Sequence, residues 1–202
     1  MRRYSSAGQL WVLLWLLSSC ASYSSFQTAQ TTELGELAVA GGIGYHEEGN
    51  EPYLNLSARY GLADSIDIGI GYNQTQNGST LIMGDVKLRV KSNSPGFHHA
   101  VGFGLSPVLY QNEGLIFHAP YFASFHTPNE KISVYANPRV LYYIDMRQEA
   151  ESNTGLGFAT SFGMKLGRKF SVIPEWSFVA GQFEDAFEIN NLISIGIGIN
   201  LN

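Results

Sequence analysis

The sequence predicts an all-β fold, a single antiparallel up-and-down transmembrane β-barrel of ten strands. From Leu34 to the C-terminus, apolar residues recur at every second position, which is the period of a strand with one apolar face. Charged residues make up only 14% of the chain, whereas soluble domains carry about 25%. Since no long apolar helix accounts for that shortage, the apolar residues are spread over many amphipathic strands.

Alternation predicts the strands in order along the chain. It is clearest at 53–62, 65–73, 84–91 and 193–202. Weaker alternation predicts six more strands, at 36–46, 98–110, 115–126, 131–144, 154–166 and 169–180. Four of these strands contain a proline, which removes a ladder hydrogen bond and could mark a bulge or a strand end: Pro107, Pro120, Pro138 and Pro174.

The polar positions of these strands indicate which face meets water. They hold mostly Gly, Ser, Ala and Asn, small residues that suit a narrow lumen. The apolar positions hold Ile, Leu, Phe and Tyr, which suit lipid, and aromatic residues lie near strand ends, as in membrane-interface girdles: Tyr60, Tyr72, Tyr142 and Trp176. This favours a membrane barrel over a soluble barrel, in which the apolar residues would point inward.

The predicted connections alternate between tight turns and longer polar loops. The longer links are 46–52, 74–78, 145–153 and 181–191. An even number of strands places both chain ends on the short-turn rim, which faces the periplasm in bacterial outer-membrane barrels.

The N-terminus has the layout of a secretory signal peptide, with Arg2 and Arg3 followed by an apolar run from Leu10 to Leu17. We therefore divide the chain into a signal peptide at 1–19, a polar tether at 20–33 and a barrel at 34–202. The signal contains two of the 12 basic residues and none of the 17 acidic ones, which leaves a mature net charge of −7. That charge argues against nucleic acid as a partner.

The residues Leu17-Ser18-Ser19-Cys20 resemble a bacterial lipobox, and Cys20 is the single cysteine of the chain. The resemblance implies that the lipoprotein signal is cut before Cys20 and that Cys20 carries the lipid. It also implies an N-terminus anchored on the periplasmic side of the outer membrane, because Ala21 and not Asp follows the cysteine.

Further segments at both ends of the predicted barrel resemble small bacterial outer-membrane barrels of no assigned activity. Ser194-x-Gly196-x-x-Ile199-x-Leu201 is similar to the C-terminal signal that the outer-membrane insertion machinery recognises. Thr28-Ala29-Gln30-Thr31, Leu34-Gly35-Glu36 and the stretch from Tyr60 to Asp67 look like the opening of such barrels. The resemblance implies outer-membrane lipid and that machinery as partners, and it does not address oligomeric state.

Some charged residues occupy strand positions on the predicted inner face of the barrel. They are the candidate lumen lining: Arg59, Asp67, Asp85, Lys87, Arg89, Arg139, Lys165 and Glu175. They could set the selectivity of a small pore, or they could fill a narrow lumen as salt bridges. We favour salt bridges, because a barrel of about eight strands is filled by its own side chains and ten strands make it little wider.

The sequence predicts no metal site, no cofactor and no enzyme. His98 and His99 are placed at a turn, and His118 and His126, eight residues apart on one strand, lie about 26 Å apart, too far to share a metal. The loop residues His46, Glu47, Glu48, Glu184, Asp185 and Glu188 form no recognisable catalytic motif.

The expected function is a lipid-anchored outer-membrane barrel with a structural or surface role, or a narrow pore for small solutes. A second hypothesis is a lipid-anchored periplasmic barrel that binds a hydrophobic ligand, although the first strand lacks the Gly-x-Trp of lipocalins. A third is an outer-membrane enzyme.

Overall fold

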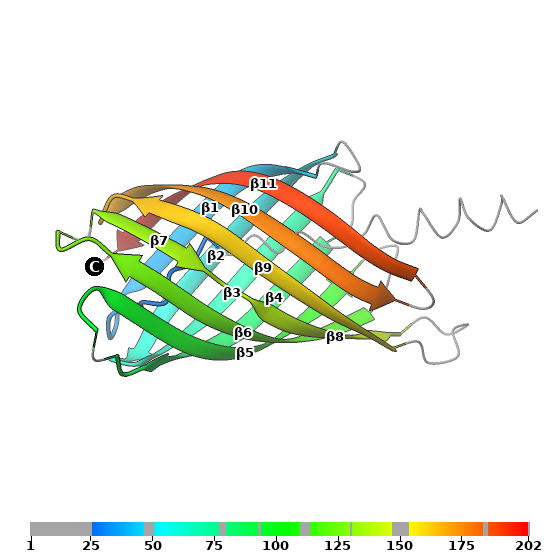
Figure 1. The fold of residues 1–202 in the computed structure, drawn as a ribbon, viewed down its shortest axis with the longest axis horizontal. Coiled ribbons are helices and arrows are strands. Elements are labelled where there is room, and N and C mark those ends of the chain that lie inside the picture. Colours follow the sequence, from blue (N-terminus) through cyan, green and yellow to red (C-terminus); the bar gives the residue numbers. More distant parts are fainter. Residues whose placement is uncertain are drawn as a thin grey trace, which may run out of the picture.

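The chain forms an antiparallel β-barrel in a computed structural model that describes residues 26–46, 51–76, 80–92, 94–109, 114–129, 131–146, 154–183 and 186–201 (Figure 1). The strands are β1 (Leu37–His46), β2 (Glu51–Ala63), β3 (Ile66–Thr75), β4 (Thr80–Val90), β5 (Phe97–Leu109), β6 (Gly114–His126), β7 (Ile132–Ala136), β8 (Arg139–Asp145), β9 (Thr154–Leu166), β10 (Phe170–Phe183) and β11 (Ala186–Leu201).

The sheet closes on itself, since β1 pairs with β2 on one side and with β11 on the other. The closing register runs from Leu37 opposite Leu201 to His46 opposite Leu192 without interruption. Every strand therefore has two neighbours, and no edge is left unpaired. This confirms the predicted all-β, antiparallel, closed barrel.

The segments β7 and β8 form one strand of the barrel, so the barrel has ten strand positions, as predicted. Both pair with β6 and β9, and the register continues unchanged across the break. The break has a local cause. The Tyr121 amide donates to the Pro138 carbonyl at 2.8 Å, but Pro138 has no N–H to donate in return.

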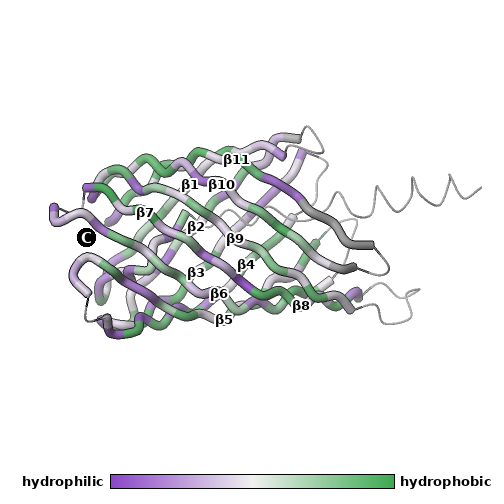
Figure 2. Tube along the Cα trace, viewed as in Figure 1, coloured by the Kyte–Doolittle hydropathy of each residue, from purple (hydrophilic) through white to green (hydrophobic). Residues whose placement is uncertain are grey.

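The outer face of the wall is apolar and the inner face is mostly polar, and Figure 2 shows this alternation along the strands. On the outside, Ile43, Ile70 and Phe103 are 65%, 60% and 61% exposed. On the inside, most buried residues are polar or charged, among them Asn55, Asp67 and Lys87. No helix in the described part of the chain is long and apolar enough to span a bilayer.

The links at the two rims overlap in length, from two to six residues at one rim and from two to eight at the other, so the predicted contrast between tight turns and long loops is weak. We keep the names short-turn rim and long-loop rim. The short-turn rim carries the links at 64–65, 91–96, 127–131 and 167–169, together with Leu37 and Leu201, the outer ends of β1 and β11. The long-loop rim carries the links at 47–50, 76–79, 110–113, 146–153 and 184–185. Both described ends of the barrel sequence thus lie at the predicted rim.

Three boundaries differ from the prediction. The segment 181–191 is not a loop, because β10 continues to Phe183 and β11 begins at Ala186, paired as one long hairpin. His98 and His99 lie in β5 rather than in a turn. β4 begins at Thr80 and not at 84, and its first residues do not alternate visibly because Leu81 and Met83 are apolar and point inward.

Candidate functional site

The most unusual feature of the lumen is residues 26–33, here called the lumenal segment, which lie inside the barrel. Phe26 is 6% exposed and Ala29 is fully buried. At the short-turn rim the chain leaves the lumen, where Leu34 forms a parallel bridge with Gly61. The segment therefore differs from the linker predicted at 20–33, which was expected outside the folded body.

Glycines in the wall, which carry no side chain, make room for the segment. The Phe26 ring lies against Gly42 and Gly196, and a Cβ at either glycine would stand 3.0 Å or less from ring atoms. Tyr135 and Ile173 complete the apolar cluster around Phe26. Glycine at these two positions is thus a packing requirement of the lumenal segment.

Main-chain groups of the segment bind to side chains of the wall. The amides of Phe26, Ala29 and Thr32 donate to Glu175 Oε2 at 2.9 Å, Ser124 Oγ at 3.1 Å and Asp67 Oδ2 at 2.9 Å. In the other direction, Asn137 Nδ2 donates to the Gln27 carbonyl at 2.7 Å. Lys87 Nζ donates to the carbonyls of Thr28 at 3.2 Å and Gln30 at 2.8 Å.

Two cations and two carboxylates pair on the inner face of the wall near the short-turn rim, beside the lumenal segment. Arg59 donates from Nε to Asp67 Oδ1 at 2.8 Å and from Nη2 to Asp85 Oδ1 at 2.6 Å, and Nη2 also contacts Asp67. Lys87 Nζ lies 3.3 Å from Asp67 Oδ2. Gln27 accepts from Arg59 Nη1 at 2.9 Å. Each buried charge faces an opposite charge, which offsets the cost of removing it from water.

The other candidate lumen residues lie apart from this network. Glu175 is buried and accepts from Tyr135 Oη at 2.6 Å and from Ser177 Oγ at 3.2 Å, in addition to Phe26. Arg139 is buried on β8. Arg89 and Lys165 line the cavity at the short-turn rim. Cys20, Glu47, Glu48, Glu184 and Asp185 lie outside the described residues, and the side chain of Glu188 is not described.

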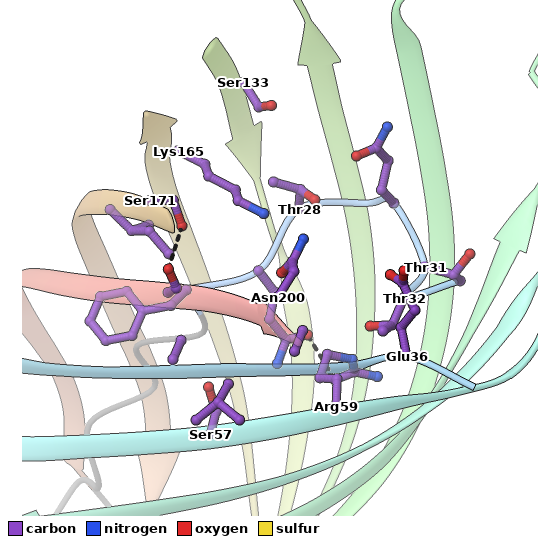
Figure 3. Close-up of a pocket in the computed structure, with 18 of the residues that line it drawn as sticks. Thr28, Thr31, Thr32, Glu36, Ser57, Arg59, Ser133, Lys165, Ser171 and Asn200 are labelled. Carbon is purple, nitrogen blue, oxygen red and sulfur yellow. Dashed lines mark hydrogen bonds between the residues drawn. The ribbon is translucent and has the colours of Figure 1, made fainter. Parts of the chain in front are cut away.

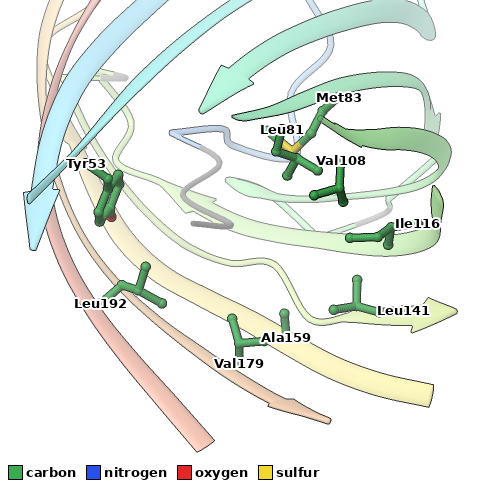
Figure 4. Packing of buried hydrophobic residues seen from close by; sticks show 9 residues of the cluster. All are labelled: Tyr53, Leu81, Met83, Val108, Ile116, Leu141, Ala159, Val179 and Leu192. Atoms are coloured by element: carbon green, nitrogen blue, oxygen red, sulfur yellow. The ribbon is translucent and has the colours of Figure 1, made fainter. Parts of the chain in front are cut away.

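An apolar layer crosses the half of the lumen nearer the long-loop rim (Figure 4). Leu81, Leu141 and Leu192 are at most 2% exposed. The layer consists of Tyr53, Leu81, Met83, Val108, Ile116, Leu141, Ala159, Val179 and Leu192. Because these residues come from β2, β4, β5, β6, β8, β9, β10 and β11, the layer closes the lumen from nearly all sides. The sequence analysis did not identify it.

The buried histidines are not arranged as metal ligands. His126 lies between two hydroxyls, with Nε2 2.8 Å from Ser124 Oγ and Nδ1 2.7 Å from Ser133 Oγ. His118 is buried, and neither of its ring nitrogens has a hydrogen-bond partner among the described residues. Within that part of the chain, no three His, Cys, Asp or Glu residues are grouped closely enough to hold a metal ion.

A cavity of about 490 Å³ opens at the short-turn rim (Figure 3). Its walls are the lumenal segment, the outer end of β1, parts of β2, β4, β7 and β11, and the strands β9 and β10 with their connecting turn. Figure 3 shows Lys165, Ser133 and Ser171 on one side of the cavity, and Glu36 beside Thr31 and Thr32 on the other. Hydroxyls, amides and charged groups share the lining with apolar side chains such as Phe26 and Ile173. The cavity therefore offers binding groups to a polar ligand.

No protein-family model and no curated protein matches the chain. Solved structures resemble it at low identity. The N-terminal β-barrel domain of Pseudomonas aeruginosa OprF is 10% identical, with a TM-score of 0.40 over 83% of this chain and 98% of that one. P. aeruginosa OprG is 11% identical, with a TM-score of 0.37 over 87% and 100% of the two chains. Yersinia pestis Ail is 15% identical, with a TM-score of 0.36 over 83% and 99%.

Proposed function

We propose that this chain is an outer-membrane β-barrel of a Gram-negative-type bacterium with a structural or surface role. A signal peptide directs its export, and a lipid on Cys20 holds its N-terminus on the periplasmic side. The main support for the proposal is that the wall has its apolar residues on the outside and its charged residues on the inside, the reverse of a soluble barrel. Ile43, Ile70 and Phe103 are exposed, whereas Asp67 and Lys87 are buried. Lipid is the solvent in which that distribution is favourable.

The dimensions of the wall support this placement. The strands are 10 residues or longer, apart from the interrupted β7 and β8, and about 9–11 tilted residues cross a hydrocarbon core. Tyr60, Tyr142 and Trp176 are 44%, 40% and 42% exposed on the outer face. Such side chains occupy membrane–water interfaces in outer-membrane barrels.

A closed barrel is a better description than an open pore. Buried apolar side chains cross one half of the lumen, and the lumenal segment lies in the other half beside the cavity. The interior also disfavours the alternative of a soluble barrel that binds a hydrophobic ligand. The apolar part of the lumen is packed with side chains, and the cavity at the rim carries charged and hydroxyl groups beside its apolar ones.

No enzyme is proposed. Ser133 and His126 are in hydrogen-bond contact, but the second ring nitrogen of His126 faces the Ser124 hydroxyl, not a carboxylate. A carboxylate in that position would orient and stabilise a catalytic imidazolium. The pair also lies beside the lumenal segment, because Ser124 accepts from the Ala29 amide. We assign the Ser124 hydroxyl to holding the segment.

The proposal is tested by comparing the purified protein with and without detergent and by electrophoresis of boiled and unboiled samples. A membrane barrel needs detergent to stay in solution and migrates differently before and after boiling. A protein that is monodisperse without detergent and shows no heat-dependent shift would overturn the proposal.

Orientation is tested separately with single cysteines. Asn129→Cys lies in a turn of the short-turn rim, and Met146→Cys lies at the long-loop rim. A maleimide that cannot cross membranes should label Met146→Cys in intact cells and should label Asn129→Cys only after the outer membrane is permeabilised. The reverse pattern would place the short turns on the cell surface.

A further inference from the structure

The cavity at the short-turn rim has the size and lining of a ligand site that the proposed structural role does not use. Small-molecule sites occupy about 300–1,000 Å³, and this cavity measures about 490 Å³. It lies between the wall and the lumenal segment, so part of it is formed by residues 27–33. The groups that line it indicate the chemical class of ligand that it would bind.

Lys165 is the central cation of the cavity. Its side chain extends from β9 into the cavity and is half-buried (Figure 3). Within the described part of the chain it makes no ion pair or hydrogen bond, whereas Arg59 and Lys87 are each bound to carboxylates. A partly desolvated ammonium without a partner is unfavourable, and a bound anion would offset that cost.

Ser133 lies opposite Lys165 in the sheet register and adds a hydroxyl donor. Its oxygen contacts Nδ1 of His126, whose Nε2 contacts Ser124. When Ser124 donates to Nε2, Nδ1 donates to Ser133, and the Ser133 hydroxyl hydrogen is then available to the cavity. In that tautomer, the Ser133 hydroxyl can donate to a ligand in the cavity that Ser133 and Lys165 both line.

Further cations stand at the mouth of the cavity. Arg89, Arg168 and Lys169 line it and are exposed. Two acids, Glu33 and Glu36, also line it, but Glu36 lies beside Thr31 and Thr32, across the cavity from Lys165 (Figure 3). The basic residues outnumber the acidic ones here, although the whole chain has a net charge of −5.

We propose that this cavity binds a phosphate group, with Lys165 as its central cation and Ser133 as a hydroxyl donor. Several cations and hydroxyls that approach from different sides match the charge and the tetrahedral oxygens of phosphate better than they match a planar carboxylate. The phosphate belongs either to a small soluble monoester or to the headgroup of a membrane phospholipid. The two sources share this chemistry and are separated by experiment.

The soluble arm is a calorimetric titration of the full mature chain, in nonionic detergent, with inorganic phosphate, glycerol 3-phosphate and acetate. We expect saturable binding of the two phosphates, weaker binding of acetate, and loss of affinity as salt is raised. The lipid arm is native mass spectrometry of the protein from micelles that contain equal amounts of phosphatidylglycerol and phosphatidylcholine. Retention of phosphatidylglycerol without binding of the soluble phosphates would identify the headgroup as the source.

Lys165→Gln should weaken binding about tenfold or more, because it removes a charge-assisted hydrogen bond, and Lys165→Arg should retain most of it. The matched control is Lys131→Gln, which removes an exposed lysine of the same rim outside the cavity. Equal losses in Lys165→Gln and Lys131→Gln would reduce the effect to general surface charge and overturn the proposal. So would acetate binding as tightly as phosphate, or no saturable binding of either phosphate up to about 10 mM together with no retained lipid.

Discussion

Lys87 Nζ donates a hydrogen bond to the carbonyl oxygen of Gln30 at 2.8 Å, which joins residues 57 positions apart in the chain. Lys87 is 2% exposed, and the same ammonium lies 3.3 Å from Asp67. The lysine thus connects the charged network of the wall to the main chain of the lumenal segment. Its burial is tolerated because carbonyl oxygens and a carboxylate replace the water that it loses.

Replacing this lysine should loosen the lumenal segment. Lys87→Met removes one of the cations beside Asp67, and it leaves the carbonyls of Thr28 and Gln30 without their donor. Breaking such a buried pair costs about 3 kcal/mol. We expect a lower free energy of unfolding and faster hydrogen exchange at the amides of Ala29 and Thr32. The control is Lys91→Met, at an exposed lysine just after β4. Equal changes in both variants would contradict a specific role of Lys87.

Removal of the lumenal segment alone should not open a pore. A chain that lacks residues 26–33 still has the apolar layer, and we expect this layer to exclude water and ions from the other half of the lumen. In planar bilayers we expect no conductance steps from this deletion. Steps should appear only when Leu81→Ser and Leu192→Ser are added, because these changes hydrate the layer. Steps from the deletion by itself would show that the segment is the sole barrier.

Gly163 should be far less tolerant of a side chain than Gly84. A Cβ at Gly163 would stand 2.2 Å from the Tyr135 ring, whose hydroxyl is bound to Glu175. A Cβ at Gly84 would meet nothing nearer than a carbonyl oxygen at 3.8 Å. We expect Gly163→Ala to lower the free energy of unfolding by about 1–3 kcal/mol, and Gly84→Ala to leave it nearly unchanged, in urea titrations of the protein folded into lipid vesicles.

The outer face allows a direct test of the surrounding medium. Ile70 lies in the middle of β3 and is 60% exposed, and Val90 ends β4 at the short-turn rim. In a bilayer, arginine costs about 2–4 kcal/mol at the midplane and about 0–1 kcal/mol near the interface. Ile70→Arg should therefore impair folding into lipid vesicles much more than Val90→Arg. A soluble barrel would accept both changes on its water-exposed face.

The lipid that we propose on Cys20 should be dispensable for attachment. Cys20→Ala should abolish incorporation of labelled palmitate, yet the exported protein should stay in the outer-membrane fraction after a carbonate wash. The reason is that each buried CH₂ of an acyl chain adds about 0.8 kcal/mol, which a soluble domain needs and an inserted barrel does not. If the variant is released as a soluble protein, the acyl chain is the anchor and the membrane barrel is wrong.

The sequence by itself determined the barrel and the side of the wall that each charge occupies. Period-two alternation is local, so Ile66, Ile68 and Ile70 already predict a strand with Asp67 on its opposite face. The same alternation, continued over ten strands with few charges, predicts a closed sheet with its apolar side outward. The same alternation within each strand places Arg59, Asp85 and Lys87 on the inner face, and it does so without knowledge of which strands pair.

Only the tertiary structure decided which of these groups meet and what fills the lumen. Arg59 contacts Asp67 and Asp85 because three strands align in register, and register is a long-range property. The lumenal segment left no pattern in its side chains, because it is held largely through main-chain amides and carbonyls. The apolar layer is assembled from residues on eight strands, such as Leu81 and Leu192, which no local window of sequence brings together.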